Sequence, residues 1–249
     1  MSVRRQDPPD EAAAARRGNY SVETSQDPVR SLAPGDPAWP PLFQRVTPSP
    51  GVLYVRGTGL PLRKPVVAIV GSRRASPLGR RQAYRLGREL AALGFVVVSG
   101  LARGIDSAAL EGALATGVAH GTGAFLGNGF PEVYPPEARD LAERIVSSGG
   151  FVATEYAPGS PPRKHHFPFR NRLISGIALG VVVVEAALRS GSLTTVGWAL
   201  DQGCEVMAYP GPVEGPQYEG CHQLLREGAA LVTGSLDVLR VLGFPDPTP

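Results

Sequence analysis

The sequence predicts an α/β protein with a doubly wound, mostly parallel sheet and helices on both faces. From Pro65 onward, short aliphatic runs alternate with amphipathic segments, and short turns join them. Such alternation is typical of a parallel sheet covered on both sides. The run Gly180–Glu185 is apolar up to its last residue, as expected of a central strand buried on both faces. The 249 residues suffice for such a core, and with 7% aromatic residues aliphatic side chains must fill it.

The elements follow from these runs and from helical periodicity. In the first helix of the alternating region, Leu86, Leu90 and Leu93 recur on one face. Its arginines fall elsewhere on the surface, where they suit either solvent or nucleic acid. Strands are predicted at 66–70, 95–99, 122–126, 151–154, 181–185 and 205–209, and helices at 78–94, 106–116, 136–148, 170–178, 191–203 and 219–227.

Four segments are predicted along the chain. Residues 1–38 are rich in Pro, Ala, Arg, Asp and Ser, with few large apolar residues, and we expect a disordered tail. Residues 39–62 form a lead-in that contains a short edge strand at Leu53–Arg56. The sheet domain spans 63–243, and residues 244–249 form a disordered end.

Charge is unevenly distributed. Residues 61–103 hold nine Lys or Arg against one acid, and residues 161–172 hold four against none, although the net charge of the chain is only +3. Segregation of this kind suits a polyanion site. Cys204 and Cys221 show no metal or redox spacing. Since the sequence contains neither a signal peptide nor a transmembrane run, we expect a cytoplasmic protein without membrane contact.

Two strand-to-helix turns have the composition of phosphate sites. The first places Gly71, Ser72, Arg73 and Arg74 after a strand, and the second is the segment 99–106. A helix N-terminus favours anions, and glycine lets the backbone approach a ligand. The adjacent arginines strengthen this interpretation for the first turn. The second turn lacks dinucleotide-binding spacing; we expect Asp106 to be structural there, whereas Ser99, Gly100 and Arg103 line the site.

The segment 161–172 is predicted to be a long basic loop that enters a helix at about Arg170. It combines four cations with two histidines and two phenylalanines. Cations interleaved with exposed aromatic rings suit single-stranded nucleic acid, with Phe167 as the stacking platform. Phe169 suits a core position equally well. The neighbouring histidines lack a third ligand, so no metal site is predicted.

A third anion-binding terminus is predicted at Ser190, Gly191 and Ser192, although ordinary helix capping explains these residues too. No catalytic motif is present. Glu155 and Glu185 both end strands, where they could form a carboxylate pair or act as caps.

Together these segments resemble the DNA-processing protein A (DprA/Smf) family over about residues 40–240. The resemblance implies an extended Rossmann-like domain. The matching motifs are VAIVGSR (67–73), VSGLARGID (98–106), YPPE (134–137), HFPFRNRLISG (166–176), VVEAALRSGSLTT (183–195), PG (210–211) and GCHQLLREGA (220–229).

The resemblance also implies a function. Such proteins bind single-stranded DNA, protect incoming strands in natural transformation, help to load the recombinase RecA, and act as homodimers without enzymatic activity or a cofactor. The DNA pocket carried over by motif consists of Arg73, Arg103, Lys164, Phe167, Arg170, Asn171, Arg172 and Ser190–Ser192.

Two other functions share the predicted core. One is a nucleoside monophosphate phosphoribohydrolase of the lysine-decarboxylase-like (LOG) group, whose catalytic loop contains an acid that the segment Ser190–Gly197 lacks. The other is a sensor of a small nucleotide. DNA-binding and hydrolysis assays separate these possibilities.

Overall fold

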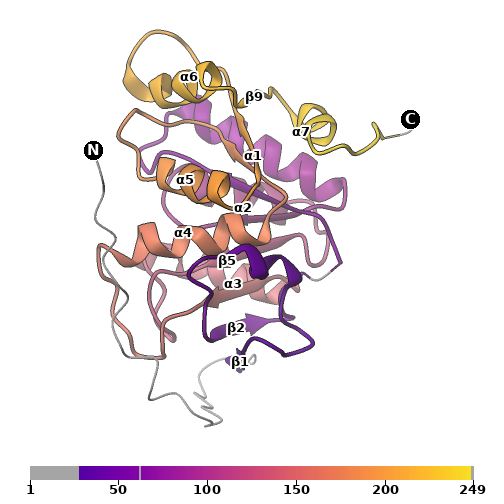
Figure 1. Ribbon diagram of the computed structural model, residues 1–249, viewed down its shortest axis with the longest axis vertical. Helices are drawn as coiled ribbons and strands as arrows, with labels where there is room; N and C mark the ends of the chain where they lie inside the picture. Colours follow the sequence, from indigo (N-terminus) through magenta and orange to yellow (C-terminus); the bar gives the residue numbers. More distant parts are fainter. Residues whose placement is uncertain (1–27, 62, 248–249) are drawn as a thin grey trace.

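The computed structural model describes residues 28–61 and 63–247, in which nine strands form a single sheet between two layers of helices (Figure 1). The strand order is β1-β2-β6-β5-β4-β3-β7-β8-β9, parallel from β6 to β9. On the other side, β1 and β2 extend the sheet with antiparallel pairing. The predicted doubly wound α/β class is therefore confirmed.

The strands are β1 (Arg30–Leu32), β2 (Leu53–Gly57), β3 (Val66–Val70), β4 (Val96–Ser99), β5 (Thr122–Phe125), β6 (Phe151–Thr154), β7 (Gly180–Val183), β8 (Glu205–Ala208) and β9 (Ala230–Leu231). The α-helices are α1 (Pro77–Ala92), α2 (Ile105–Leu114), α3 (Arg139–Ser147), α4 (His166–Ile177), α5 (Leu193–Asp201), α6 (Glu219–Arg226) and α7 (Ser235–Val241), and the 3₁₀ helices are η2 (Pro41–Arg45), η3 (Pro136–Ala138) and η4 (Pro216–Tyr218).

Alternate residues of the central strands supply the two cores. In β3, Val66, Ala68 and Val70 pack against η2, α4, α5 and α6. Val67 and Ile69 of the same strand face α1, α2 and α7 on the other side. All five side chains are buried because the strand is covered on both faces, which explains its uninterrupted apolar sequence.

The chain reverses its direction of winding at β3. From β3 it proceeds through β4, β5 and β6 towards one edge, then returns to place β7 on the other side of β3. In open α/β sheets, ligands bind beyond the carboxyl ends of the strands at such a switch point. The turns after β3 and β7 meet there.

The prediction of a disordered tail is wrong for its C-terminal part, which contains β1. Arg30–Leu32 pairs with β2, and the Arg30 guanidinium donates to the Gly57 carbonyl over 2.6 Å. Val29 and Leu32 pack against two of the hydrophobic cores. A short strand needs few apolar residues when a neighbouring strand supplies the hydrogen bonds, so composition concealed it. The rest of that prediction, residues 1–27, lies outside the described residues.

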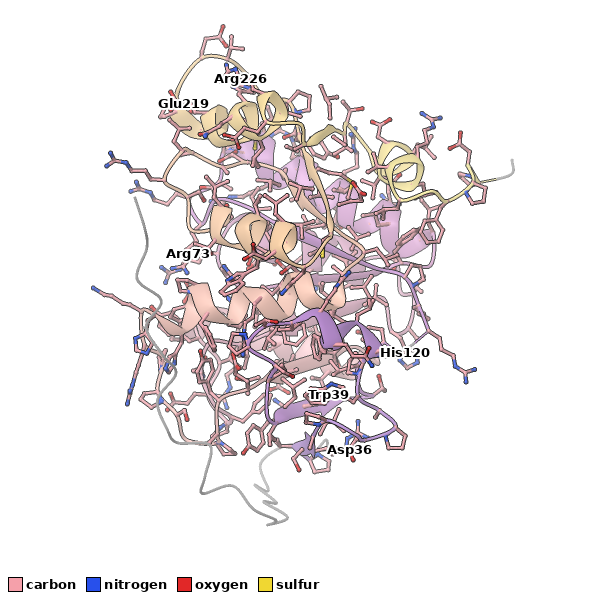
Figure 2. All side chains as sticks on the ribbon, in the orientation of Figure 1. Asp36, Trp39, Arg73, His120, Glu219 and Arg226 are labelled. Carbon is pink, nitrogen blue, oxygen red and sulfur yellow. The ribbon has the colours of Figure 1, made fainter. Side chains whose placement is uncertain are left out.

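The lead-in segment is part of the core. Phe43 is fully buried, and its ring lies 5.7 Å from that of Trp39, which is labelled in Figure 2. The Arg45 guanidinium donates to the carbonyls of Ser175 and Gly176, each over 3.3 Å, and so caps the end of α4. The predicted edge strand at 53–56 lies between β1 and β6 instead.

The C-terminal elements also differ from the prediction. β9 and α7 were not predicted because they are short. The predicted disordered end makes contacts: the ring of Phe244 lies 5.0 Å from that of Phe95, and Asp246 pairs with Arg240 over 2.8 Å. Residues 248–249 lie outside the described part of the chain.

Candidate nucleic-acid interface

The loops after β3, β4 and β7 are fastened together at the switch point. The amide of Ser72 donates to the Glu185 carbonyl over 2.7 Å, and the amide of Ile105 donates to the Ser72 carbonyl over 3.2 Å. Gly104 has φ +81°, and a Cβ there would lie 2.8 Å from the Arg73 carbonyl oxygen. Glycine is therefore required for the second loop to reach the first.

These loops enclose a pocket of about 450 Å³. Arginines and hydroxyl groups dominate its lining, and its one carboxylate among the described residues is that of Asp106. Figure 2 shows Arg73 beside the N-terminal ends of α4 and α5. The lining residues are Val70, Gly71, Ser72, Arg73, Arg74, Ala102, Asp106, Arg170, Asn171, Ile174, Ala187, Arg189, Ser190, Gly191, Ser192 and Thr195.

Arg170 is buried on the wall of the pocket. Its guanidinium donates to the Gly100 carbonyl over 3.0 Å and to the Phe125 carbonyl. Burial lowers the pKa of Arg170 to about 10, although the neighbouring Asp106 opposes that shift. Arg170 thus stays protonated at neutral pH and supplies positive potential from a fixed position.

Asp106 holds the second loop. Its Oδ2 accepts from the amides of Gly100 over 3.1 Å and Ala102 over 3.4 Å. Burial raises the pKa of the Asp106 carboxyl, and Arg170 counteracts part of this effect. The structural role predicted for Asp106 is confirmed, although it closes the loop rather than capping α2, whose N-cap is Gly104.

The hydroxyl loop before α5 contributes side chains rather than open amides. Ser190 Oγ and Ser192 Oγ lie 2.8 Å apart, and the amide of Thr195 donates to the Ser192 carbonyl over 3.0 Å. Asn171 of α4 donates to Thr194 Oγ1 over 2.8 Å and joins the two helices. The N-terminus of α5 is therefore largely satisfied within the chain, and the exposed Gly191 backbone and the serines face the pocket.

Glu185 already occupies the N-terminus of α1. The fully buried carboxylate accepts from the Ser76 amide over 3.0 Å and from the Ser76 hydroxyl over 2.5 Å. The anion expected at this terminus is thus the chain's own carboxylate, and the possible pair with Glu155 does not form. The predicted phosphate site of the first turn is thereby restricted to the loop of Ser72, Arg73 and Arg74.

An aromatic cluster lies beside Arg73, one of the residues that line the pocket. The half-buried Phe167 ring lies 5.4 Å from the ring of Tyr134. The Arg73 guanidinium carbon lies 5.5 Å from the centroid of the Phe167 ring. A Cβ on Gly127 would lie 2.7 Å from Phe167, so the glycine makes room for the ring. Tyr134 is 41% exposed. Sequence reasoning placed this tyrosine only within a family motif, and the signal for it was an aromatic residue next to proline.

The predicted basic loop is shorter than expected, because α4 begins at His166. Arg172 is consequently directed into the protein. It is 1% exposed, pairs with Glu155 over 2.5 and 2.9 Å, and stacks at 3.9 Å on Phe169. Its assignment to the DNA pocket is wrong. Burial raises the pKa of Glu155 against the opposing effect of Arg172.

Like Phe167, four other predicted site residues do not line the pocket. Ser99 is fully buried and donates to the Ile69 carbonyl over 2.6 Å, which ties β4 to β3. Arg103 is exposed but pairs with Glu137, which raises the pKa of Arg103. Gly100 lies behind the wall, where a Cβ would lie 2.7 Å from Arg170. Lys164 is exposed just before α4, also outside the lining.

The fold and the pocket define a doubly wound α/β protein with an arginine- and hydroxyl-lined pocket at its switch point. The chain belongs to the DNA recombination-mediator protein A family, whose profile matches residues 30–243. This confirms the resemblance seen in the motifs. Within the described residues, no helix is both long and apolar enough to cross a lipid bilayer.

The Smf protein of Escherichia coli is 43% identical over 230 residues, which are 90% of this chain and 61% of Smf. The chain therefore spans about three fifths of that relative. The structure of DNA processing protein A from Streptococcus pneumoniae has a TM-score of 0.78 at 38% identity, covering 88% of this chain and 75% of that one. The structure of DNA processing protein A from Helicobacter pylori, described for its single-stranded DNA binding mode, has a TM-score of 0.74 at 27% identity. The match covers 86% of this chain and 95% of that one.

Proposed function

We propose that this chain binds single-stranded DNA, with phosphates held in the switch-point pocket. The observation that carries the proposal is the convergence of Arg73, Arg74, Arg170 and Arg189 on one pocket. Among the described residues, the only carboxylate in its lining is that of Asp106, which is already bonded within the chain. Guanidinium groups recognise phosphate oxygens in bidentate geometry, and charge-assisted contacts of this type are strong. The Helicobacter pylori relative binds the same ligand.

The aromatic cluster supports a single strand rather than a duplex. Unpaired bases can stack on an accessible ring, whereas bases within a duplex cannot. Tyr134 is the more accessible ring, and Phe167 lies between it and Arg73. We therefore propose that Tyr134 stacks on a base, while Phe167 supports that tyrosine and positions the Arg73 guanidinium.

The pocket composition favours a binding protein over a hydrolase. Cleavage of a glycosidic bond calls for an available carboxylate as acid, base or nucleophile. Asp106 accepts two backbone hydrogen bonds and faces Arg170, so its carboxylate is not available as a catalytic acid, base or nucleophile. Incubation with nucleoside monophosphates should release no free base. Release of a base that stopped in Asp106→Asn would favour the hydrolase.

Membership of the family extends the proposal to a cellular role. We propose that the chain protects incoming single strands during DNA uptake and helps to load RecA onto them as a homodimer. Co-purification with RecA, in the presence and absence of an oligonucleotide, tests whether the chain binds RecA. Light scattering measures the molecular mass in solution and so tests whether the chain forms a homodimer.

The central test compares affinities for a labelled single strand and a duplex of equal length at matched salt. The single strand should bind more tightly, and Arg73→Gln/Arg74→Gln should weaken its binding. Arg139→Gln/Arg144→Gln removes the same charge from α3 and serves as the control. Equal affinity for both forms, or equal losses in both variants, would contradict a specific single-strand site.

A further inference from the structure

The outer face of α1 carries a basic surface that the pocket does not use. Arg81, Tyr84, Arg85 and Arg88 follow the spacing i, i+3, i+4 and i+7, which places them on one face of the helix. All four are exposed, and Tyr84 retains 40% of its accessible surface. The opposite face of the helix is buried through Ala83, Leu86 and Leu90. α2 packs along the flank, where a Cβ on Gly87 would collide with the Ala109 carbonyl and a Cβ on Gly112 of α2 would collide with the Tyr84 carbonyl. We call these four residues the α1 ridge.

Much of the charge of the ridge is not neutralised within the protein. Arg85 pairs with Glu89 at 3.6 Å and donates to the Thr233 carbonyl over 2.7 Å. In the described part of the chain, neither Arg81 nor Arg88 has a carboxylate within 4.0 Å. Two guanidiniums beside an exposed aromatic ring offer both phosphate and base contacts.

The ridge is continuous with the pocket. Arg74 lines the pocket, Ser76 caps α1, and Arg80 and Arg81 follow within about one turn. Figure 1 shows α1 running from the α6 side of the molecule towards α7. The helix has 16 residues and is therefore about 24 Å long. A strand held at the pocket can follow it for several nucleotides.

We propose that the α1 ridge binds the backbone of the single-stranded DNA that leaves the pocket, with Tyr84 in contact with a base. This inference rests on the proposed function and lengthens its footprint. An acidic protein segment would also suit the charge, but continuity with the pocket and the aromatic ring within the ridge favour a nucleic-acid strand.

The experiment compares a short oligonucleotide, of about six nucleotides, with one of about twenty. Arg81→Gln/Arg88→Gln should leave the Kd for the short strand within about twofold and raise the Kd for the long strand about tenfold. The slope of log affinity against log salt on the long strand should flatten by about 1.4, or about 0.7 per lost contact. Glutamine preserves helix propensity, and an unchanged melt verifies the fold.

Arg139→Gln/Arg144→Gln on α3, on the other side of α2, is the matched control. Tyr84→Ala is a further variant that leaves the charge unchanged. It should raise the Kd for the long strand at least fivefold. Unchanged long-strand affinity in Arg81→Gln/Arg88→Gln, or an equal loss of affinity in the control variant, would contradict the proposal that the α1 ridge binds DNA. If wild-type protein binds the long strand alone and the ridge variant abolishes that binding, the pocket fails and the ridge stands. If wild-type protein binds neither strand, both proposals fail.

Discussion

The aromatic cluster permits a sharp test, because its two rings differ in exposure. Tyr134 is 41% exposed, so Tyr134→Ala leaves little cavity. Apart from the lost contact with the Phe167 ring, the substitution should lower the free energy of unfolding by less than about 1 kcal/mol. Removal of a stacking platform should weaken oligonucleotide binding by about 1–3 kcal/mol. A melt and a fluorescence-anisotropy titration measure the two quantities separately.

Phe167→Ala should show the opposite balance. Truncation of a fully buried phenylalanine costs about 3–5 kcal/mol, so the half-buried Phe167 should cost about 2 kcal/mol of stability. Binding should also weaken, since Arg73 and Tyr134 both lose the ring against which they lie. Phe167→Leu keeps most of the apolar volume and should recover much of the stability.

A double-mutant cycle decides whether the rings act as a unit. If Phe167 supports Tyr134, the binding losses of the two alanine variants should not add, with a coupling energy of about 0.5–1.5 kcal/mol. Wild-type affinity in Tyr134→Ala, together with a binding loss in Phe167→Ala, would show that Phe167 itself is the platform.

Three further predictions concern structural residues. Arg172→Ala should destabilise the fold by about 3–5 kcal/mol in urea, because it leaves Glu155 buried without its partner; a cost below 1 kcal/mol would mean that water enters the site. The Arg56 guanidinium lowers the pKa of Glu143, so this pair stabilises the fold above the ordinary glutamate pKa and loses that contribution on acidification; Glu143→Gln should therefore reduce the acid-side slope of stability against pH. Deletion of residues 1–38 removes β1 and should lower the free energy of unfolding by about 1–3 kcal/mol, whereas an unchanged melt would show that β1 contributes nothing.

The sequence by itself determined the central strands of the sheet and most of the helices. An aliphatic run such as Val66–Val70 can be stable only where both faces are covered, and the period of α1 separates its apolar stripe from its arginines. Gly71 and the arginines after it form a strand-to-helix turn as predicted, and the phosphate that this turn is expected to bind stays a prediction. These features are local, and a local pattern suffices to predict them.

Tertiary structure alone decided which charged residues are accessible. Arg170 and Arg172 are two positions apart on α4, so they point to different sides of the helix: one reaches the pocket wall, and the other enters the core beside Glu155. The distinction depends on the start of α4 at His166 and on partners that are distant in the sequence. In the same way, Glu185 caps α1 across 109 positions. Whether a charge is paired, buried or free is a property of the contacts that folding creates, and composition does not contain it.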